Sequence, residues 1–245
     1  FRPIIMDIAQ LSFLGMLTKS RSNNVKRLVI SDTHIGSKFS RKEEIYELLK
    51  EKEYDQLILN GDIIEFLKVP TFSKVALEIF KVAKNKAKEI IYIIGNHDVA
   101  MNSFVNEDFE NIKFVTEYCF EEGGRKFRIE HGDKYETGIV HHRTLMSIIS
   151  TFQDALEKIF DIDLSTWFAN LKINKRKIKR LWDIIDLNMD VDVVVVGHTH
   201  VPEAVIWIDE DEKIKTYVNC GDWVQHATYV EITDGVVRLR NFLKK

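Results

Sequence analysis

The sequence predicts an α/β domain with a parallel sheet at its centre and a helical insertion before its last strands. From Val25 onward, short apolar runs alternate with amphipathic stretches in the order strand, helix, strand, helix, strand. This order is typical of parallel strands joined by right-handed crossovers. Residues 137–189 contain no proline and only one glycine, Gly138, which favours nearly continuous helix. After Asp192 the chain returns to apolar runs separated by turn residues, which predicts further strands.

The elements before the insertion follow from the length and spacing of these runs. Strands are expected where four to six apolar residues follow a polar boundary, and helices where charged residues share a stretch with apolar ones at helical spacing. The expected strands cover residues 27–31, 55–60, 89–94, 112–115, 118–122 and 126–130, and the expected helices cover residues 41–52 and 72–86. The pair Gly123-Gly124 predicts a tight turn between the last two of these strands.

The elements after the insertion begin with a buried strand at residues 192–196 (DVVVV). Pairs of short strands are then expected at residues 204–208, 215–219, 228–232 and 236–241, with turns at residues 209–211 and 234–235. Residues 25–245 therefore form one domain, preceded by residues 1–24. Within that leading segment, residues 4–17 have apolar side chains at helical spacing and are too short to cross a bilayer. We expect a helix packed on its own domain or on a partner subunit, with a helix on a membrane surface as the alternative, followed by a polar linker at residues 18–24.

Composition excludes several classes of protein. Hydrophobic residues make up 45% of the 245 residues and charged residues 30%, which excludes a disordered chain. The net charge of −3 argues against a surface built as a whole to coat nucleic acid. Cys119 and Cys220 are too few for a disulfide scaffold or a cysteine-rich zinc module, so we expect a reducing, cytoplasmic compartment.

Five polar motifs follow predicted strands directly. They are SDTH at residues 31–34, NGD at 60–62, GNHD at 95–98, EHGD at 130–133 and GHTH at 197–200. Open α/β sheets gather their ligand sites at the carboxyl ends of strands, so the motifs are expected to meet. An Asp-x-His or His-x-His pair also places two side chains on the same side of an extended segment.

The side chains in these motifs are typical of a metal site. Imidazole and carboxylate groups suit a divalent ion such as Mn, Fe, Zn, Co or Ni. Seven side chains are candidate ligands: Asp32, His34, Asp62, Asn96, His131, His198 and His200. A single ion that keeps an open position takes fewer ligands than this from a protein. Seven ligands fit two ions about 3.5–4 Å apart that share a carboxylate. Two such ions outweigh the two aspartates in charge, and the remaining positive charge suits a phosphate group and a metal-bound hydroxide.

The series SDTH, NGD, GNHD, HGD and GHTH resembles the calcineurin-like metallophosphoesterases over residues 26–242. That resemblance implies a sandwich of two β-sheets flanked by helices, with two metal ions between the sheets, manganese being the first expectation. Carried over by motif, Asp32, His34 and His200 would hold the first ion, Asn96, His131 and His198 the second, and Asp62 would bridge them. His97 matches the catalytic histidine of the family, and Asp98 would orient it.

Within this family, GHTHVPEA and the following YVNCGDW are most similar to the UDP-2,3-diacylglucosamine pyrophosphatases of lipid A biosynthesis. The similarity predicts cleavage of a pyrophosphate bond in a nucleotide-diphosphate lipid, with residues 137–190 as a helical lid. The third motif departs from the pattern, because it reads GNHD where those enzymes commonly read GNRD. A phosphodiesterase or nuclease, a phosphomonoesterase, and a non-catalytic protein-binding scaffold are the alternatives. The expected partner is a phosphorylated small molecule or lipid, with peripheral contact to the inner membrane surface or binding of nucleic acid as further alternatives.

The remaining histidines and the basic run have simpler interpretations. His141, His142 and His226 are expected to be surface or packing residues, because the ligand set is already complete. Residues 172–180 contain six basic residues in nine and predict a solvated helix face, with an anion-binding patch as the alternative.

Overall fold

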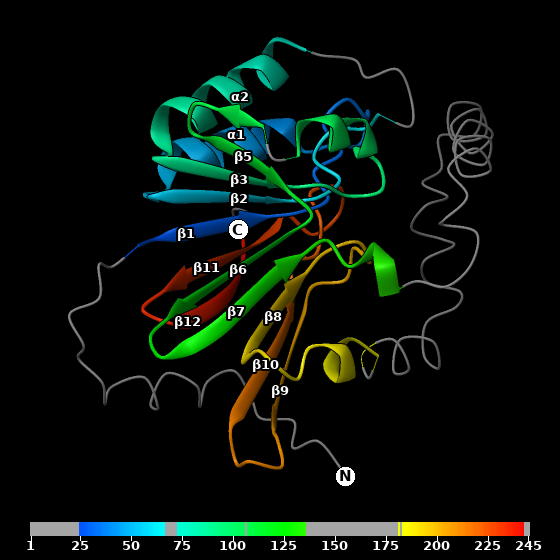
Figure 1. Cartoon of the computed structure of the whole chain (residues 1–245). Helices are drawn as coiled ribbons and strands as arrows, with labels where there is room; N and C mark the ends of the chain where they lie inside the picture. The colour runs from blue at the N-terminus through cyan, green and yellow to red at the C-terminus, as the bar shows by residue number, and fades with distance from the viewer. Residues whose placement is uncertain (1–24, 67–72, 106, 136–180, 182, 243–245) are drawn as a thin grey trace, which may run out of the picture.

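The computed structural model of the chain describes residues 25–66, 73–105, 107–135, 181 and 183–242 (Figure 1). The predicted helix and linker at residues 1–24, and the insertion between residues 136 and 180, lie outside these residues. No helix in the described ranges is long and apolar enough to cross a membrane.

The larger of two mixed sheets has seven strands in the order β12-β11-β1-β2-β3-β5-β4. Their bounds are Arg27–Ile30 (β1), Gln56–Asn60 (β2), Glu89–Ile93 (β3), Asp108–Phe109 (β4), Ile112–Val115 (β5), Thr228–Thr233 (β11) and Val236–Asn241 (β12). Strands β1, β2, β3 and β5 run parallel, with Leu28 opposite Leu57 and Ile58 opposite Ile91. The chain returns at its end to add β11 antiparallel to β1.

The smaller sheet has five strands in the order β6-β7-β8-β10-β9. Their bounds are Glu117–Glu122 (β6), Arg125–Glu130 (β7), Val193–Val196 (β8), Glu203–Ile208 (β9) and Ile214–Asn219 (β10). Strand β8 lies parallel to both of its neighbours, and the outer pairs are antiparallel. The carboxyl ends of β7 and β8 therefore point the same way.

Two α-helices cover the outer face of the larger sheet, and the smaller sheet covers its other face (Figure 1). Helix α1 (Lys42–Glu51) buries Ile45, Leu48 and Leu49, which follow helical spacing. Helix α2 (Lys74–Lys86) begins after Ser73, whose side chain accepts a hydrogen bond from the backbone N–H of Ala76 at 3.2 Å. The helices are thus held to the sheet by one apolar face each.

The central strands are buried on both faces. Leu28, Leu57 and Ile90 pack toward the helices, while Val29, Ile58 and Ile91 pack toward the smaller sheet. Facing them from the smaller sheet are Phe127, Ile129, Val193, Val195 and Val218. Full burial of such a side chain contributes about 1.5–3 kcal/mol, so this two-sided core rigidly supports the strand ends that carry the polar motifs.

The predicted sandwich of two sheets flanked by helices is confirmed, and every expected strand is present within one or two residues of its predicted bounds. Three short elements were not expected from the sequence: β4, and the 3₁₀ helices η3 (Val99–Phe104) and η4 (Asp133–Tyr135). Each is a 3₁₀ helix of three or six residues or a two-residue pairing, too short to produce a periodic pattern.

A buried hydrogen-bond network lies at the base of the insertion. The side-chain amide of Asn188 donates to the Tyr135 hydroxyl at 2.7 Å, and that hydroxyl donates to the Glu130 carboxylate. Arg128 donates to Asn188 at 2.7 Å and to Asp190 at 2.8 Å. The residues that precede and follow the insertion are therefore joined beside the end of β7.

Candidate metal centre

The five polar motifs meet between the two sheets, at the carboxyl ends of β1, β2, β3, β7 and β8. Backbone hydrogen bonds join the loops in pairs: Asp32 N–H donates to Gly61 O at 3.1 Å, His34 N–H to Asp62 O at 3.0 Å and Gly197 N–H to His131 O at 2.9 Å. A β-carbon at position 61 would collide with the His131 ring, and Gly61 also has a positive φ of 75°. Only glycine allows both the turn and this close approach.

All seven predicted ligands lie at this junction. Asp32, His34, Asp62 and His131 are buried and form the floor of the site, while Asn96, His198 and His200 are half-buried at its rim. Among the described residues, three sets have ligand atoms that all lie within 4.8 Å of one another. Two consist of predicted ligands, namely Asp32, His34 and His200 in the first set, and Asp62, His131 and His198 in the second; the other combines His34 with Glu65 and His97.

The first set brings three ligand atoms to a common point. Nε2 of His34 lies 3.2 Å from Nε2 of His200, which lies 3.3 Å from Oδ1 of Asp32. That carboxylate oxygen is fully buried, and among the described residues its partner is the His200 ring. A buried acceptor beside two facing imidazole nitrogens is costly unless a cation lies among them, so this donor set fits a divalent ion.

In the second set, the His131 ring also turns its Nε2 toward the centre of the site. Its Nδ1 donates to the backbone carbonyl of Asn60 at 3.0 Å, which places the lone pair of the neutral ring on Nε2. Nε2 lies 3.2 Å from Oδ2 of Asp62 and 3.3 Å from Oδ1 of Asn96. A histidine whose outer nitrogen is held by an acceptor is the usual arrangement of a metal ligand.

Five of the seven predicted ligands have left-handed backbone conformations. The φ angles are 52° at Asp32, 45° at His34, 53° at Asp62, 66° at His198 and 59° at His200. Each such conformation costs a non-glycine residue about 1–3 kcal/mol and persists only where its surroundings enforce it. Hydrogen bonds do so here, because Oδ2 of Asp32 accepts from the His198 N–H at 2.9 Å and Oδ1 of Asp62 accepts from the His97 N–H at 2.8 Å.

The charges of the site stabilise one another. Burial alone raises the pKa of Asp62, but His131 and His97 hold the pKa of that carboxyl well below its ordinary value. Burial lowers the pKa of His200, while its hydrogen bond to Asp32 and the charge of that carboxylate raise it, to about 9. Without a metal at neutral pH, the Asp62 carboxyl is therefore ionised and the His200 ring carries a proton.

Glu65 is a residue of the site that sequence reasoning missed. Its buried carboxylate lies between two histidines, with Oε2 at 3.1 Å from Nδ1 of His34 and Oε1 at 2.8 Å from Nδ1 of His97. The burial of this carboxyl raises its pKa, yet the two histidines lower it far below the ordinary value. An acidic residue in the apolar stretch IIEF, three positions after Asp62, was the available signal.

His97 lies at the edge of the site, with Nε2 at 3.9 Å from Oδ2 of Asp62. The structure assigns the orientation of its ring to Glu65, in place of the predicted Asp98. Oδ2 of Asp98 accepts from the Tyr92 hydroxyl at 2.7 Å and from the Ile63 N–H at 3.0 Å. Burial and the neighbouring Asp62 raise the pKa of Asp98 to about 6. Asp98 therefore shapes the loop that carries His97, because its carboxylate faces the backbone and away from the ring.

Comparison with protein families matches residues 25–202 to the calcineurin-like phosphoesterases. The chain belongs to this family. Among solved structures, this phosphoesterase is similar to Vps29 of Cryptosporidium parvum, at 16% identity over 89% of this chain and 96% of that one, with a TM-score of 0.48. It is also similar to Vps29 of Entamoeba histolytica in complex with zinc, at 15% identity over 89% and 99% of the two chains and a TM-score of 0.40.

A third similar structure is YfcE, a phosphoesterase from E. coli, at 18% identity over 86% of this chain and 90% of that one, with a TM-score of 0.40. No curated protein matches the sequence. At these identities and TM-scores, the solved structures assign neither a substrate nor a partner to this phosphoesterase.

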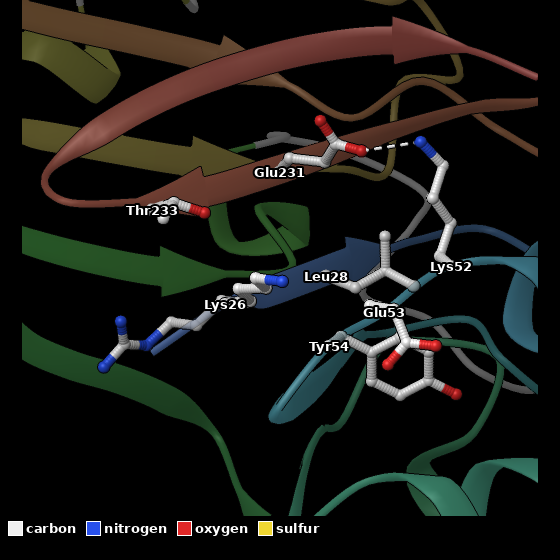
Figure 2. A pocket seen from close by; sticks show the side chains of 8 residues that line it. Lys26, Leu28, Lys52, Glu53, Tyr54, Glu231 and Thr233 are labelled. Atoms are coloured by element: carbon white, nitrogen blue, oxygen red, sulfur yellow. Dashed lines mark hydrogen bonds and ion pairs between the residues drawn. The ribbon is translucent and has the colours of Figure 1, made fainter. Parts of the chain in front are cut away.

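A cavity of about 180 Å³ lies at the opposite, amino-terminal end of β1 (Figure 2). Its lining carries both signs of charge, from Lys26, Arg27, Lys52, Glu53 and Glu231, and Nζ of Lys52 donates to Glu231 at 2.9 Å. Because the metal-ligand candidates lie at the other strand ends, this cavity is separate from the candidate metal centre.

Proposed function

We propose that this phosphoesterase is a metal-dependent phosphohydrolase that binds two divalent ions. Asp32, His34 and His200 would hold one ion, Asn96, His131 and His198 the other, and Asp62 would contribute to both. The facing Nε2 atoms of His34 and His200, 3.2 Å apart beside a buried oxygen of Asp32, are the observation that carries this proposal. Manganese is the ion we propose first, and Fe, Zn, Co and Ni suit the same donors.

When bound, the two ions supply a Lewis acid for a phosphoryl oxygen and lower the pKa of a bound water molecule. The residues of the chain control the charge around that chemistry. Two buried aspartates place two negative charges against four positive ones, which leaves the site attractive to a phosphate. The half-buried Asn96, His198 and His200 leave the rim open to solvent, so a substrate phosphate has a path to the floor.

His97 is the residue we propose as general acid. Glu65 holds Nδ1 of the ring, so Nε2 is free to face the site, 3.9 Å from Asp62. Burial lowers the pKa of His97, but the charge of Asp62 and the hydrogen bond that the ring donates to Glu65 raise it above its ordinary value. A ring whose pKa is raised holds its proton more readily than a free imidazole and can donate it from Nε2 to the leaving oxygen, a contribution that is typically 10²–10⁴-fold in rate.

For the substrate, we propose the pyrophosphate bond of a nucleotide-diphosphate lipid of the UDP-2,3-diacylglucosamine type. This finer assignment is supported by the sequence patterns GHTHVPEA and YVNCGDW, which begin at Gly197 and Tyr217. The family assignment itself implies only a phosphorylated substrate.

The activity is tested by removing metal with a chelator and restoring Mn, Fe, Co, Ni or Zn one at a time. Hydrolysis of a chromogenic phosphodiester or monoester is expected to return with at least one ion, and to stay absent in His34→Ala. Failure with all five ions, in a chain that remains folded, would overturn the proposal. Release of UMP from UDP-2,3-diacylglucosamine tests the substrate separately, because a chain that cleaves the chromogenic ester alone has the activity without this lipid specificity.

A further inference from the structure

The turn at residues 222–226 lies beside His200, outside the set of groups used above. The Asp222 side chain is fully buried, and its Oδ1 accepts backbone N–H groups of Val224 at 2.7 Å, Gln225 at 2.5 Å and His226 at 3.3 Å. Its Oδ2 accepts from Nδ1 of His226 at 2.7 Å and lies 3.9 Å from Nδ1 of His200. One carboxylate oxygen therefore faces two imidazole rings.

Backbone contacts fix this turn against the first metal-ligand set. The N–H of Trp223 donates to the carbonyl of Asp32 at 3.1 Å, and the N–H of Arg41 donates to the carbonyl of Trp223 at 2.9 Å. The Trp223 side chain is fully buried. Asp222 is thus held in a defined position relative to Asp32 and His200.

Three of the four histidines among the predicted ligands have a described group at their outer nitrogen, and these groups differ. Nδ1 of His34 has the Glu65 carboxylate at 3.1 Å, and Nδ1 of His131 has the Asn60 carbonyl at 3.0 Å. For His200 the corresponding group is Asp222 at 3.9 Å, longer than a hydrogen bond. Asp222 is itself held by a second histidine, His226, much as Glu65 behind His34 also contacts His97. An acceptor behind a liganding imidazole fixes the orientation of the ring and makes its inner nitrogen more basic.

We propose that His226 is a positioning residue for the metal centre. Through its hydrogen bond it holds the Asp222 carboxylate against Nδ1 of His200, and thereby raises the affinity of the Asp32, His34 and His200 set for a divalent ion. The side chain of His226 is 39% exposed, and its described contacts reach Asp222 and not the ligands themselves. This inference rests on the proposed function, because it assigns a role toward the ions of that site.

The test is a titration of the chelator-treated full chain with Co²⁺, whose visible absorption spectrum reports the geometry of its ligands, and with Zn²⁺ by calorimetry. The parent chain is expected to take up two equivalents. In His226→Ala, one equivalent is expected to bind about tenfold more weakly, at the low end of the 10–100-fold range for partners of metal ligands. The second equivalent is the internal control, and Val224→Ala is the matched control in the same turn.

Two further variants separate positioning from simple loss of structure. His226→Asn keeps a donor near Asp222 and is expected to recover part of the affinity. Asp222→Asn retains one oxygen for the backbone N–H groups of the turn but loses the oxygen that faces both rings. Because His226 acts through that oxygen, His226→Ala should add no further loss of affinity in the Asp222→Asn background, and the melting temperature of each metal-free variant checks its folding.

Each outcome distinguishes this inference from the proposed function. A parent chain that binds no metal overturns the proposed function and the inference with it. Two unchanged affinities in His226→Ala, or additive losses in the double variant, overturn the positioning role and leave the proposed function intact. Equal weakening of both equivalents together with a lowered melting temperature also overturns it, because that pattern describes general destabilisation.

Discussion

Nε2 of His34 lies 3.2 Å from Nε2 of His200. The outer nitrogen of His34 faces Glu65, and that of His200 faces Asp222. The inner nitrogens of the two rings therefore face each other. Two neutral rings in this arrangement would direct lone pairs at each other, which favours either a proton or a metal ion between them. Competition between proton and metal therefore governs the chemistry of the centre.

The affinity for metal is expected to rise with pH and to level off near the raised pKa of His200, about 9. Below that pH the ring must release a proton before it can bind an ion, so binding is coupled to proton release. Calorimetric titrations in two buffers of different ionisation enthalpy measure the number of protons released. Binding that releases no proton at neutral pH would contradict this prediction.

Without metal, the stability of the folded chain is expected to change with pH in the opposite direction. A folded-state pKa of about 9 against an ordinary value of 6.5 makes protonated His200 stabilising. Its contribution is complete below pH 6.5 and is lost as the pH rises through 9. Urea unfolding in the presence of a chelator measures this loss, and His200→Asn should show a smaller change over the same pH interval.

His97→Ala is expected to lower turnover by about 10²–10⁴-fold, the usual value of a general acid, while both metal equivalents stay bound. The metal ligand that we propose in this motif is the adjacent Asn96, so metal content should not follow activity. Elemental analysis and steady-state kinetics on the same preparation separate the two quantities. A missing equivalent in this variant would show that His97 is a ligand.

Glu65→Gln is expected to lower both metal affinity and turnover, because the carboxylate contacts His34 and His97 at once. Loss of a carboxylate behind a ligand typically costs 10–100-fold in affinity. The matched control is Glu43→Gln at the exposed start of α1, which should change neither quantity. An effect of Glu65→Gln on turnover alone, at saturating metal, would limit its role to His97.

Tyr135→Phe is expected to destabilise the chain by about 1–3 kcal/mol, because it leaves the buried carboxylate of Glu130 without its hydroxyl donor. The same change also removes one of the two described acceptors of the Asn188 amide, the other being the carbonyl of Ile184. Urea denaturation measures the free energy of unfolding, with Tyr46→Phe on α1 as the control. Equal stability of the two variants would show that the network at the base of the insertion is dispensable.

The positions of the metal-ligand candidates follow from the sequence because each motif directly follows an apolar strand. Parallel strands place their carboxyl ends at one edge, so Asp32, Asp62 and Asn96 had to meet. The roles of Glu65 and Asp98 could not be predicted from the sequence, since both depend on loop conformation. Asp98 adjoins His97 in sequence yet bonds to Tyr92, and Glu65 reaches His97 only because the loop after β2 folds back over the site.

The sequence pattern also did not predict which strands pair with one another in each sheet. The apolar alternation of residues 228–232 predicted a strand but not its neighbour. Its pairing with β1 joins segments from opposite ends of the chain, and such non-local pairing leaves no mark in a local window.

The pairing of β11 with β1 also means that the larger sheet can be completed only late in translation. Strand β1 has one neighbour as soon as β2 emerges, but its other edge stays open until Thr228–Thr233 have been translated. A nascent chain that stops before Thr228 already carries all seven metal-ligand candidates, the last of which is His200. It nevertheless exposes the backbone of a buried strand, which is a template for pairing with other chains. Premature termination in this interval therefore yields a polypeptide with a complete ligand set and an aggregation-prone edge.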